Sequence, residues 1–83
     1  MRATVLVRPK PGILDPQGTA VEQSLRQLGF AVGNARIGRV VDLDLEAADP
    51  VAAHALVAEM CEQLLANPLI EGYEIALEPD REP

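Results

Sequence analysis

The sequence predicts an α+β two-layer sandwich in which two helices cover one face of a mostly antiparallel, three-stranded sheet. Three observations support this fold class. Three segments alternate polar and apolar residues with the period of a strand. Two intervening segments repeat apolar residues at helical spacing, and each begins with an Asp-Pro pair, a helix-start signal. The order is strand–helix–strand–helix–strand. We assign residues 1–78 of the 83 to a single domain and residues 79–83 to a flexible tail.

The first predicted strand covers residues 2–8 and ends before two prolines, Pro9 and Pro11, that cannot donate to a β-ladder. Leu6 interrupts the otherwise polar face of this strand. That face is therefore expected to be covered too, by a helix or by another chain. Gly12 permits a sharp turn after the strand. The apolar face consists of Ala3, Val5 and Val7.

The first predicted helix covers residues 16–28. Asp15 is its expected N-cap, and Pro16 occupies the first helical position. Gly29 is placed for a left-handed C-cap, after which Phe30 falls where it contacts the last turn. The expected buried stripe is Val21, Leu25 and Leu28.

Gly18 is unusual because a glycine in the first turn of a helix costs up to ~1 kcal/mol relative to alanine. One interpretation is a frayed helix start, with Thr19 as an alternative cap. The other is a close approach to the backbone, either by an anion at the helix N-terminus or by a partner chain.

Residues 34–46 alternate like a strand that is longer than the usual ~5–6 residues. Gly38 suggests a bend, and Arg39 falls on the apolar parity. The strand is therefore bent, or extends beyond its own sheet to pair with a second copy, or splits near Gly38. A split would give the ferredoxin-like order β-α-β-β-α-β with four strands. We interpret the acidic alternation as a solvated face rather than as a metal site. It consists of Asp42, Asp44 and Glu46.

The second predicted helix runs from the Asp-Pro pair at 49–50 to about residue 66, where the Asn-Pro pair at 67–68 stops it. The last strand covers residues 73–77. A sheet this small leaves exposed edges, so we expect oligomerisation to complete it. The expected core stripe of the helix is Ala53, Val57, Met60, Cys61 and Leu64, flanked by Leu56 and Leu65.

The net charge of −6 argues against nucleic acid and against an anionic membrane surface as partners. A single cysteine, Cys61, allows no internal disulfide and fits a reducing compartment. The N-terminal apolar run is too short for a signal sequence, and no segment approaches the length of a membrane span. The expected localisation is cytoplasmic.

The sequence offers no self-contained catalytic group. His54 and Cys61 are seven residues apart, so on one helix they are separated by two turns, about 10 Å along the axis. That separation is too large for a nucleophile–base pair. One histidine and one cysteine also fall short of a metal site. We expect no catalytic residue, no metal site and no bound cofactor.

Three segments resemble one known family. They are RPKPGILDPQGTAVEQSLRQLGF (8–30), NARIGRVVDLDLEA (34–47) and EMCEQLLANPLIEGYEI (59–75). Together they are similar to the PurS-type small subunits of phosphoribosylformylglycinamidine (FGAM) synthase, with spacing intact over nearly the whole chain. Only residues 79–83 lie outside the pattern.

The resemblance implies a non-catalytic subunit of a glutamine amidotransferase complex in purine biosynthesis. In that family a glutaminase subunit releases ammonia, and a synthetase subunit uses ATP and Mg to convert formylglycinamide ribonucleotide (FGAR) to FGAM. The small subunit binds both, forms homodimers or tetramers, and assists ammonia transfer. The alternative is a free-standing, ferredoxin-like regulatory dimer that binds a small molecule between its chains.

The predicted partner interface combines the loop before the first helix with the bend in the middle strand. A proline-stiffened loop presents backbone, and two arginines add positive charge to an acidic protein. The alternative is that these residues only shape turns and keep sheet edges soluble. The candidates are Lys10, Pro11, Gly12, Asp15, Pro16, Gly18, Arg36, Gly38 and Arg39.

Overall fold

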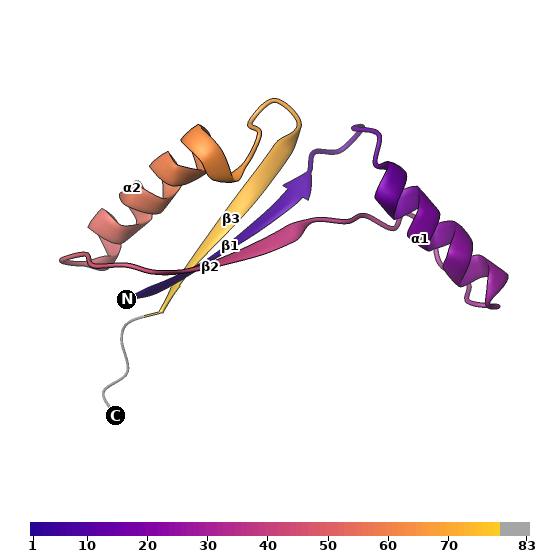
Figure 1. Cartoon of the computed structure of the whole chain (residues 1–83), viewed down its shortest axis with the longest axis horizontal. Helices are drawn as coiled ribbons and strands as arrows, with labels where there is room; N and C mark the ends of the chain where they lie inside the picture. The colour runs from indigo at the N-terminus through magenta and orange to yellow at the C-terminus, as the bar shows by residue number, and fades with distance from the viewer. Residues whose placement is uncertain (79–83) are drawn as a thin grey trace.

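The computed structural model describes residues 1–78; the tail predicted at 79–83 lies outside this part. The described chain has three strands and two helices in the predicted order (Figure 1). The α+β class with an antiparallel sheet is therefore confirmed. The elements are β1 (Arg2–Pro9), α1 (Pro16–Gln27), β2 (Arg39–Asp44), α2 (Pro50–Met60), the π-helical turn η1 (Cys61–Leu65) and β3 (Glu71–Glu78).

The sheet has the order β2-β1-β3, with β1 antiparallel to both neighbours. Val5 of β1 lies opposite Val41 of β2 and Ile75 of β3. The side chains of Ala3, Val5 and Val7 are buried, which confirms the predicted apolar face of this strand. The last strand is longer than predicted, because Glu71 and Gly72 also pair with the end of β1.

The core lies between the sheet and the helix formed by α2 and η1. Ala53, Val57 and Cys61 are buried as predicted, but Met60 and Leu64 are not. Leu64 is 83% exposed. The cause is the π-helical turn, in which the amide of Ala66 donates to the carbonyl of Cys61. This wider turn brings Leu65, rather than Leu64, against the core.

The middle strand is shorter than predicted. Only Arg39–Asp44 forms β2, and residues 30–38 form no strand. Pairing with β1 stops at Val7 and Arg39, just before Pro9, which has no N–H to donate. The alternation from residue 34 to residue 38 therefore lies outside the paired region, although β1 itself continues to Pro9 beside β3. Among the described residues the segment does not split into a hairpin, so the order is β-α-β-α-β.

The first helix has the predicted local structure. Asp15 caps α1, and the amides of Gly29 and Phe30 donate to the carbonyls of Arg26 and Leu25, both at 3.0 Å. Gly29 has φ = +98°, the left-handed conformation that favours glycine at a helix C-cap. The start, the end and the cap of this helix are therefore confirmed.

The position of α1 differs from the prediction that both helices cover one face of the sheet. Figure 1 shows α1 standing apart from the sheet, at the end opposite to the N-terminus. It packs extensively against no other helix or strand of the described chain. Its predicted buried stripe is largely open: Val21 is 39% and Leu28 is 74% exposed. We call residues 10–38 the arm, and residues 1–9 together with 39–78 the body.

Candidate interaction surface

The predicted interface residues lie mainly at the root of the arm. There the outgoing loop (10–15), which precedes α1, meets the returning segment (30–38), which follows it. The Asp15 carboxylate joins these two segments. It accepts hydrogen bonds from the amide of Gly18 (2.9 Å), which caps α1, and from the amide of Ile37 (2.8 Å), in the returning segment. The Ile37 amide, followed by the Gly18 amide, lowers the pKa of Asp15, because both bonds favour the charged form.

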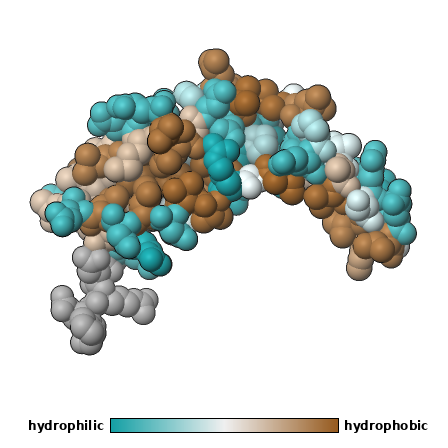
Figure 2. Space-filling view, in the orientation of Figure 1, coloured by the Kyte–Doolittle hydropathy of each residue, from teal (hydrophilic) through white to brown (hydrophobic). Residues whose placement is uncertain are grey.

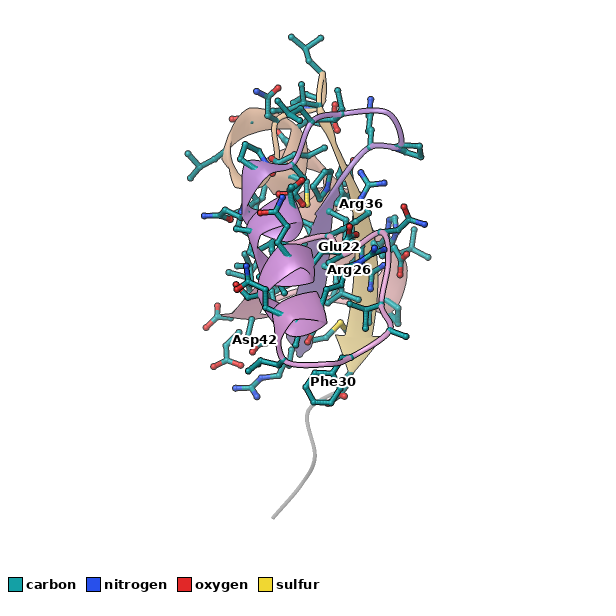
Figure 3. The ribbon with its side chains drawn as sticks, turned by 90° about the vertical axis from the view of Figure 1, so that its right-hand side faces the viewer. Glu22, Arg26, Phe30, Arg36 and Asp42 are labelled. Atoms are coloured by element: carbon teal, nitrogen blue, oxygen red, sulfur yellow. The ribbon has the colours of Figure 1, made fainter. Side chains whose placement is uncertain are left out.

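Arg36 makes a second connection at the arm root. One of its terminal nitrogens, Nη2, donates to the backbone carbonyls of Pro9 (2.8 Å) and Lys10 (2.6 Å). These carbonyls lie where β1 ends and the outgoing loop begins. Figure 3 shows Arg36 on the returning segment, on the same side of α1 as Glu22 and Arg26. Arg36 therefore stiffens the connection between body and arm.

Two glycines allow the backbones to approach closely at this root. A Cβ atom on Gly18 would collide with the carbonyl oxygen of Ala35, and one on Gly38 would collide with the carbonyl oxygen of Val7. The group that approaches Gly18 is thus the returning segment of the same chain, not an anion or a partner chain. The alternative cap, Thr19, is also wrong, because Asp15 caps the helix.

The loop that precedes α1 presents its first residues to solvent. Lys10, Pro11 and Gly12 are all exposed, and Gly12 has φ = +84°. Lys10 holds the loop to the body: its amide donates to the carbonyl of Ile70 (2.8 Å) and its Nζ to the carbonyl of Pro68 (2.6 Å). Pro16 occupies the first helical position. The loop is therefore fixed at its start and at its end.

Arg39 directly follows the arm root, but its side chain has a function within the body. Its guanidinium binds the Glu71 carboxylate with two bonds of 2.8 and 3.0 Å, and it also donates to the carbonyl of Leu65 (2.5 Å). The amide of Asn67 donates to the same carboxylate. Arg39, more than any other group, lowers the pKa of Glu71. These contacts explain why a charged residue falls on the apolar parity of β2: it closes one end of the core.

Sequence reasoning missed the exposed apolar side chains of the arm outside α1. Leu14 is 82% and Phe30 is 57% exposed, and Ile13 and Ile37 are also exposed. One signal in the sequence could have revealed this apolar surface: two adjacent apolar residues, at 13 and 14, lie inside a loop rich in proline and glycine. Figure 2 shows the body and α1 as the two limbs of an arch, with apolar surface on both.

Two hollows lie along the arm root. One, of about 440 Å³, is bordered by Leu6, Arg8 and Val40 of the sheet and by Arg36 of the arm. The other, of about 400 Å³, lies beside Ile13 and Leu14, next to the start of α1. Arg36 borders both hollows. The face of the sheet that carries Leu6 and Val40, opposite to the face that α2 covers, thus continues into the apolar surface of the arm.

The remaining candidate groups lie elsewhere. His54 is exposed on α2, whereas Cys61 is buried, and burial raises the pKa of its thiol. Asp42 accepts from the hydroxyl of Thr4 (2.9 Å), and Asp44 pairs with an arginine of β1. Within residues 1–78, no three His, Cys, Asp or Glu side chains are placed to hold a metal ion. In the same part of the chain, neither helix has the length and apolarity to cross a membrane.

The fold and this surface define a class of protein: a small α+β chain whose body forms a core of its own and whose arm exposes apolar surface of the kind that contacts other polypeptides. Comparison with known proteins identifies the family. The model of the family described as PurS, phosphoribosylformylglycinamidine (FGAM) synthase, matches residues 2–79. The chain belongs to this family of FGAM synthase subunits, as the resemblance implied.

Individual relatives agree with this assignment. The FGAM synthase subunit PurS of Synechocystis is 47% identical over 70 residues, which cover 83% of this chain and 70% of the relative. The crystal structure of Methanocaldococcus jannaschii PurS superposes with a TM-score of 0.86 at 36% identity, covering 96% of this chain and 98% of the other. A chain in the structure of PurLQS from Thermotoga maritima gives 0.84 at 33% identity, covering 90% and 93%.

Proposed function

We propose that this chain joins the glutaminase and the ATP-dependent synthetase subunits of FGAM synthase and assists the transfer of ammonia between them. The overall reaction converts FGAR and glutamine to FGAM and glutamate. In this proposal the chain supplies no catalytic residue and binds no cofactor, whereas the synthetase subunit uses ATP and Mg. The complex works in the cytoplasm, and the chain also associates with itself as a dimer or a tetramer.

The observation that carries this proposal is the exposed apolar surface of the arm. Leu14, Leu28 and Phe30 are each more than half exposed on a segment that contributes nothing to the core of the body. Apolar surface gathered in this way marks protein–protein contact sites. Family membership supports the choice of partners, since a relative in the structure of PurLQS shares this fold.

The predicted interface residues divide into two kinds in this proposal. Lys10, Pro11 and Gly12 are exposed and lie where a partner subunit has access. The residues of the arm root act indirectly, because they fix the direction of the arm. These are Asp15, Pro16, Gly18, Arg36 and Gly38. Arg39 contributes through its exposed half, since its side chain is 50% exposed.

Reconstitution with the two large subunits tests the proposal. FGAM formation is measured with glutamine and, separately, with a high concentration of ammonium as the nitrogen source. We expect omission of the chain to reduce the glutamine-dependent rate at least tenfold and to leave the ammonium-dependent rate within twofold. Equal glutamine-dependent rates with and without the chain contradict the proposal.

A pair of variants locates the contact. We expect Leu14→Asp, in the outgoing loop, to weaken binding to the large subunits, whereas Gln17→Asp, on the exposed polar part of α1, is the matched control with the same added charge. Isothermal titration calorimetry with amino acids and nucleotides tests the alternative. Tight binding by the isolated chain, without effect on the large subunits, favours the regulatory dimer.

A further inference from the structure

One arginine at the arm root, Arg36, differs from every other arginine in residues 1–78. Each of the others forms a salt bridge with a carboxylate, at distances between 2.8 and 3.9 Å. Arg36 forms none within this part of the chain, although the protein has 13 acidic residues and a net charge of −6. Its positive charge therefore lacks the partner that its counterparts have. The pairs are Arg2–Asp44, Arg8–Glu74, Arg26–Glu22 and Arg39–Glu71.

The hydrogen bonds of Arg36 use only one of its three side-chain nitrogens. Nη2 donates to the carbonyls of Pro9 and Lys10, whereas Nε and Nη1 donate to no group within residues 1–78. A backbone carbonyl accepts a hydrogen bond but carries no net charge, so these contacts leave the charge of the guanidinium uncompensated. The side chain is also exposed. Arg36 can therefore hold its position at the end of β1 and still donate to a further group.

The larger hollow at the arm root gathers positive charge beside this arginine. Eight residues border its volume of about 440 Å³; three of them are arginines and none is acidic. Arg8 and Arg39 are paired with Glu74 and Glu71, which leaves Arg36 as the arginine of this hollow without a carboxylate in the described chain. Small-molecule sites of about 300–1,000 Å³ commonly combine a few polar groups with an apolar lining. The volume and the charge of this hollow suit a small anion.

A second donor borders the same hollow. Asn34 lies two residues before Arg36, and its side-chain amide forms no hydrogen bond within residues 1–78. Its backbone has φ = +57°, a left-handed conformation that asparagine and aspartate adopt more readily than most other residues. The amide group donates without adding charge. Arg36 and Asn34 thus offer a charged and a neutral donor from one short segment.

The smaller hollow, on the α1 side of Arg36, is less suitable for an anion. Asp15 and Glu22 border it. Glu22 accepts from the amide of Ala35 (3.3 Å) and forms its salt bridge with Arg26, and Asp15 accepts from backbone amides. These two carboxylates would repel a second negative group. An anion bound by Arg36 therefore belongs on the sheet side, in the larger hollow.

The remaining border of the larger hollow strengthens an electrostatic contact. Leu6, Val7 and Val40 supply apolar wall around the donors. Apolar walls exclude water and lower the local dielectric constant, so an arginine attracts an anion more strongly there than in open solvent. Hydrogen bonds from a guanidinium to a phosphate or a carboxylate are also stronger than those between neutral groups.

We propose that the larger hollow at the arm root binds a small oxyanion: the phosphate or carboxylate group of a small molecule. Arg36 supplies the charge, and Asn34 supplies a second donor. Because Arg36 also binds the carbonyls of Pro9 and Lys10, a bound anion would hold the returning segment against the end of β1. The site goes beyond the proposed function and does not depend on it.

NMR titration of the isolated full-length chain tests the site. Inorganic phosphate and acetate are added separately at constant ionic strength, and sodium chloride is the control. We expect the Nε–Hε signal of Arg36 and the side-chain amide signals of Asn34 to shift and saturate with phosphate, with acetate or with both, but not with chloride. Saturation by phosphate alone identifies a phosphate group, and saturation by acetate identifies a carboxylate. Shifts that do not saturate with either anion overturn the proposal.

Two matched substitutions separate the hollow from general charge effects. Asn34→Asp places a negative charge at the hollow, breaks no hydrogen bond within residues 1–78 and keeps a residue that tolerates the left-handed conformation. Gln23→Glu adds the same charge on the exposed surface of α1, away from the hollow. We expect Asn34→Asp to weaken anion binding at least tenfold and Gln23→Glu to change it less than twofold. Equal affinities for the two variants overturn the site.

A third variant tests the guanidinium itself. Arg36→Lys keeps the positive charge but loses the planar set of donors, so we expect anion binding to weaken severalfold. Backbone amide signals of the body that stay unchanged show that the variant is folded. Undiminished binding by Arg36→Lys contradicts the role of Arg36.

The anion site and the proposed function fail in different ways. If neither anion saturates the signals but Arg36→Lys weakens binding to the large subunits, the arm root serves a protein contact; the anion site is then wrong and the proposed function survives. If an anion saturates the signals but omission of the chain leaves glutamine-dependent FGAM formation unchanged, the site survives and the proposed function is wrong.

Discussion

The body and the arm contain the same kind of helix in different surroundings. Each helix begins with Asp-Pro, and in each the aspartate accepts a hydrogen bond from the third following amide: Gly18 for Asp15 (2.9 Å) and Ala52 for Asp49 (2.8 Å). The helix of the body buries Ala53 and Val57 against the sheet, whereas the only buried residue of α1 is a glycine. Local signals thus determine where a helix forms, but not what covers it.

The connections to the sheet account for this difference. The π-helical turn after α2 is followed by a short loop to β3, which Arg39 and Glu71 hold against the end of the helix. The arm instead leaves and returns through two segments that are tied to each other by Asp15. The first arrangement places a helix on the sheet, and the second holds a helix away from it.

The largest expected effect comes from a charge in the core of the body. Val57 is fully buried, while Val51, on the same helix, is 80% exposed. We expect Val57→Asp to reduce the free energy of unfolding by about 3–5 kcal/mol, because the carboxylate has no partner there. Val51→Asp should change it by less than about 0.5 kcal/mol. Urea unfolding followed by circular dichroism measures both; similar losses would contradict the assignment of the core.

A methyl group at the arm root should produce a smaller effect, confined to the arm. In an open helix, Gly→Ala stabilises by up to ~1 kcal/mol. At Gly18 the added Cβ collides with the Ala35 carbonyl, so we expect a loss of about 1–3 kcal/mol. The readout is the amide hydrogen exchange of α1. Gly72→Ala, where nothing lies within 4 Å, is the control and should be neutral or stabilising.

The smallest expected effect is a pH dependence of the body. Arg39 lowers the pKa of Glu71 below its ordinary value of 4.5. The resulting stabilisation is therefore present above about pH 4.5 and is lost as the pH falls through the lowered value in the folded state. We expect Glu71→Gln to cost about 1 kcal/mol at pH 7 and to flatten the acid limb of the stability curve. Parallel curves of stability against pH for the unsubstituted protein and the Glu71→Gln variant would show that the Arg39–Glu71 pair does not contribute to the pH dependence.

The features that depend only on residues close together in the sequence were predicted correctly. Asp15 and Gly29 marked the two ends of α1, and the alternation of Ala3, Val5 and Val7 marked the buried face of β1. Residues 34–38 were predicted as strand because their alternation continues, yet pairing with β1 stops at Arg39, although β1 itself continues to Pro9 beside β3. The exposure of Leu64 depends on a π-helical turn for which the sequence has no simple signal.

The candidate surface was predictable only in part. Its turn residues were recognisable as glycines and prolines, but the structure shows Gly18 and Gly38 packed against backbone of the same chain. An amphipathic stripe such as that of α1 indicates that something covers it, not which chain does. The exposed side chain of Leu14 was not predicted to be part of the surface, because a single apolar residue in a loop is ordinary.

Amide hydrogen–deuterium exchange across a dilution series tests most directly whether the body is ordered by its own chain and the arm by another. We predict that protection of α1 (Pro16–Gln27) falls as the isolated chain is diluted, while protection of β1 and α2 stays constant. Protection of α1 that equals that of β1 at every concentration would contradict the account, because the arm would then be stable without a second chain.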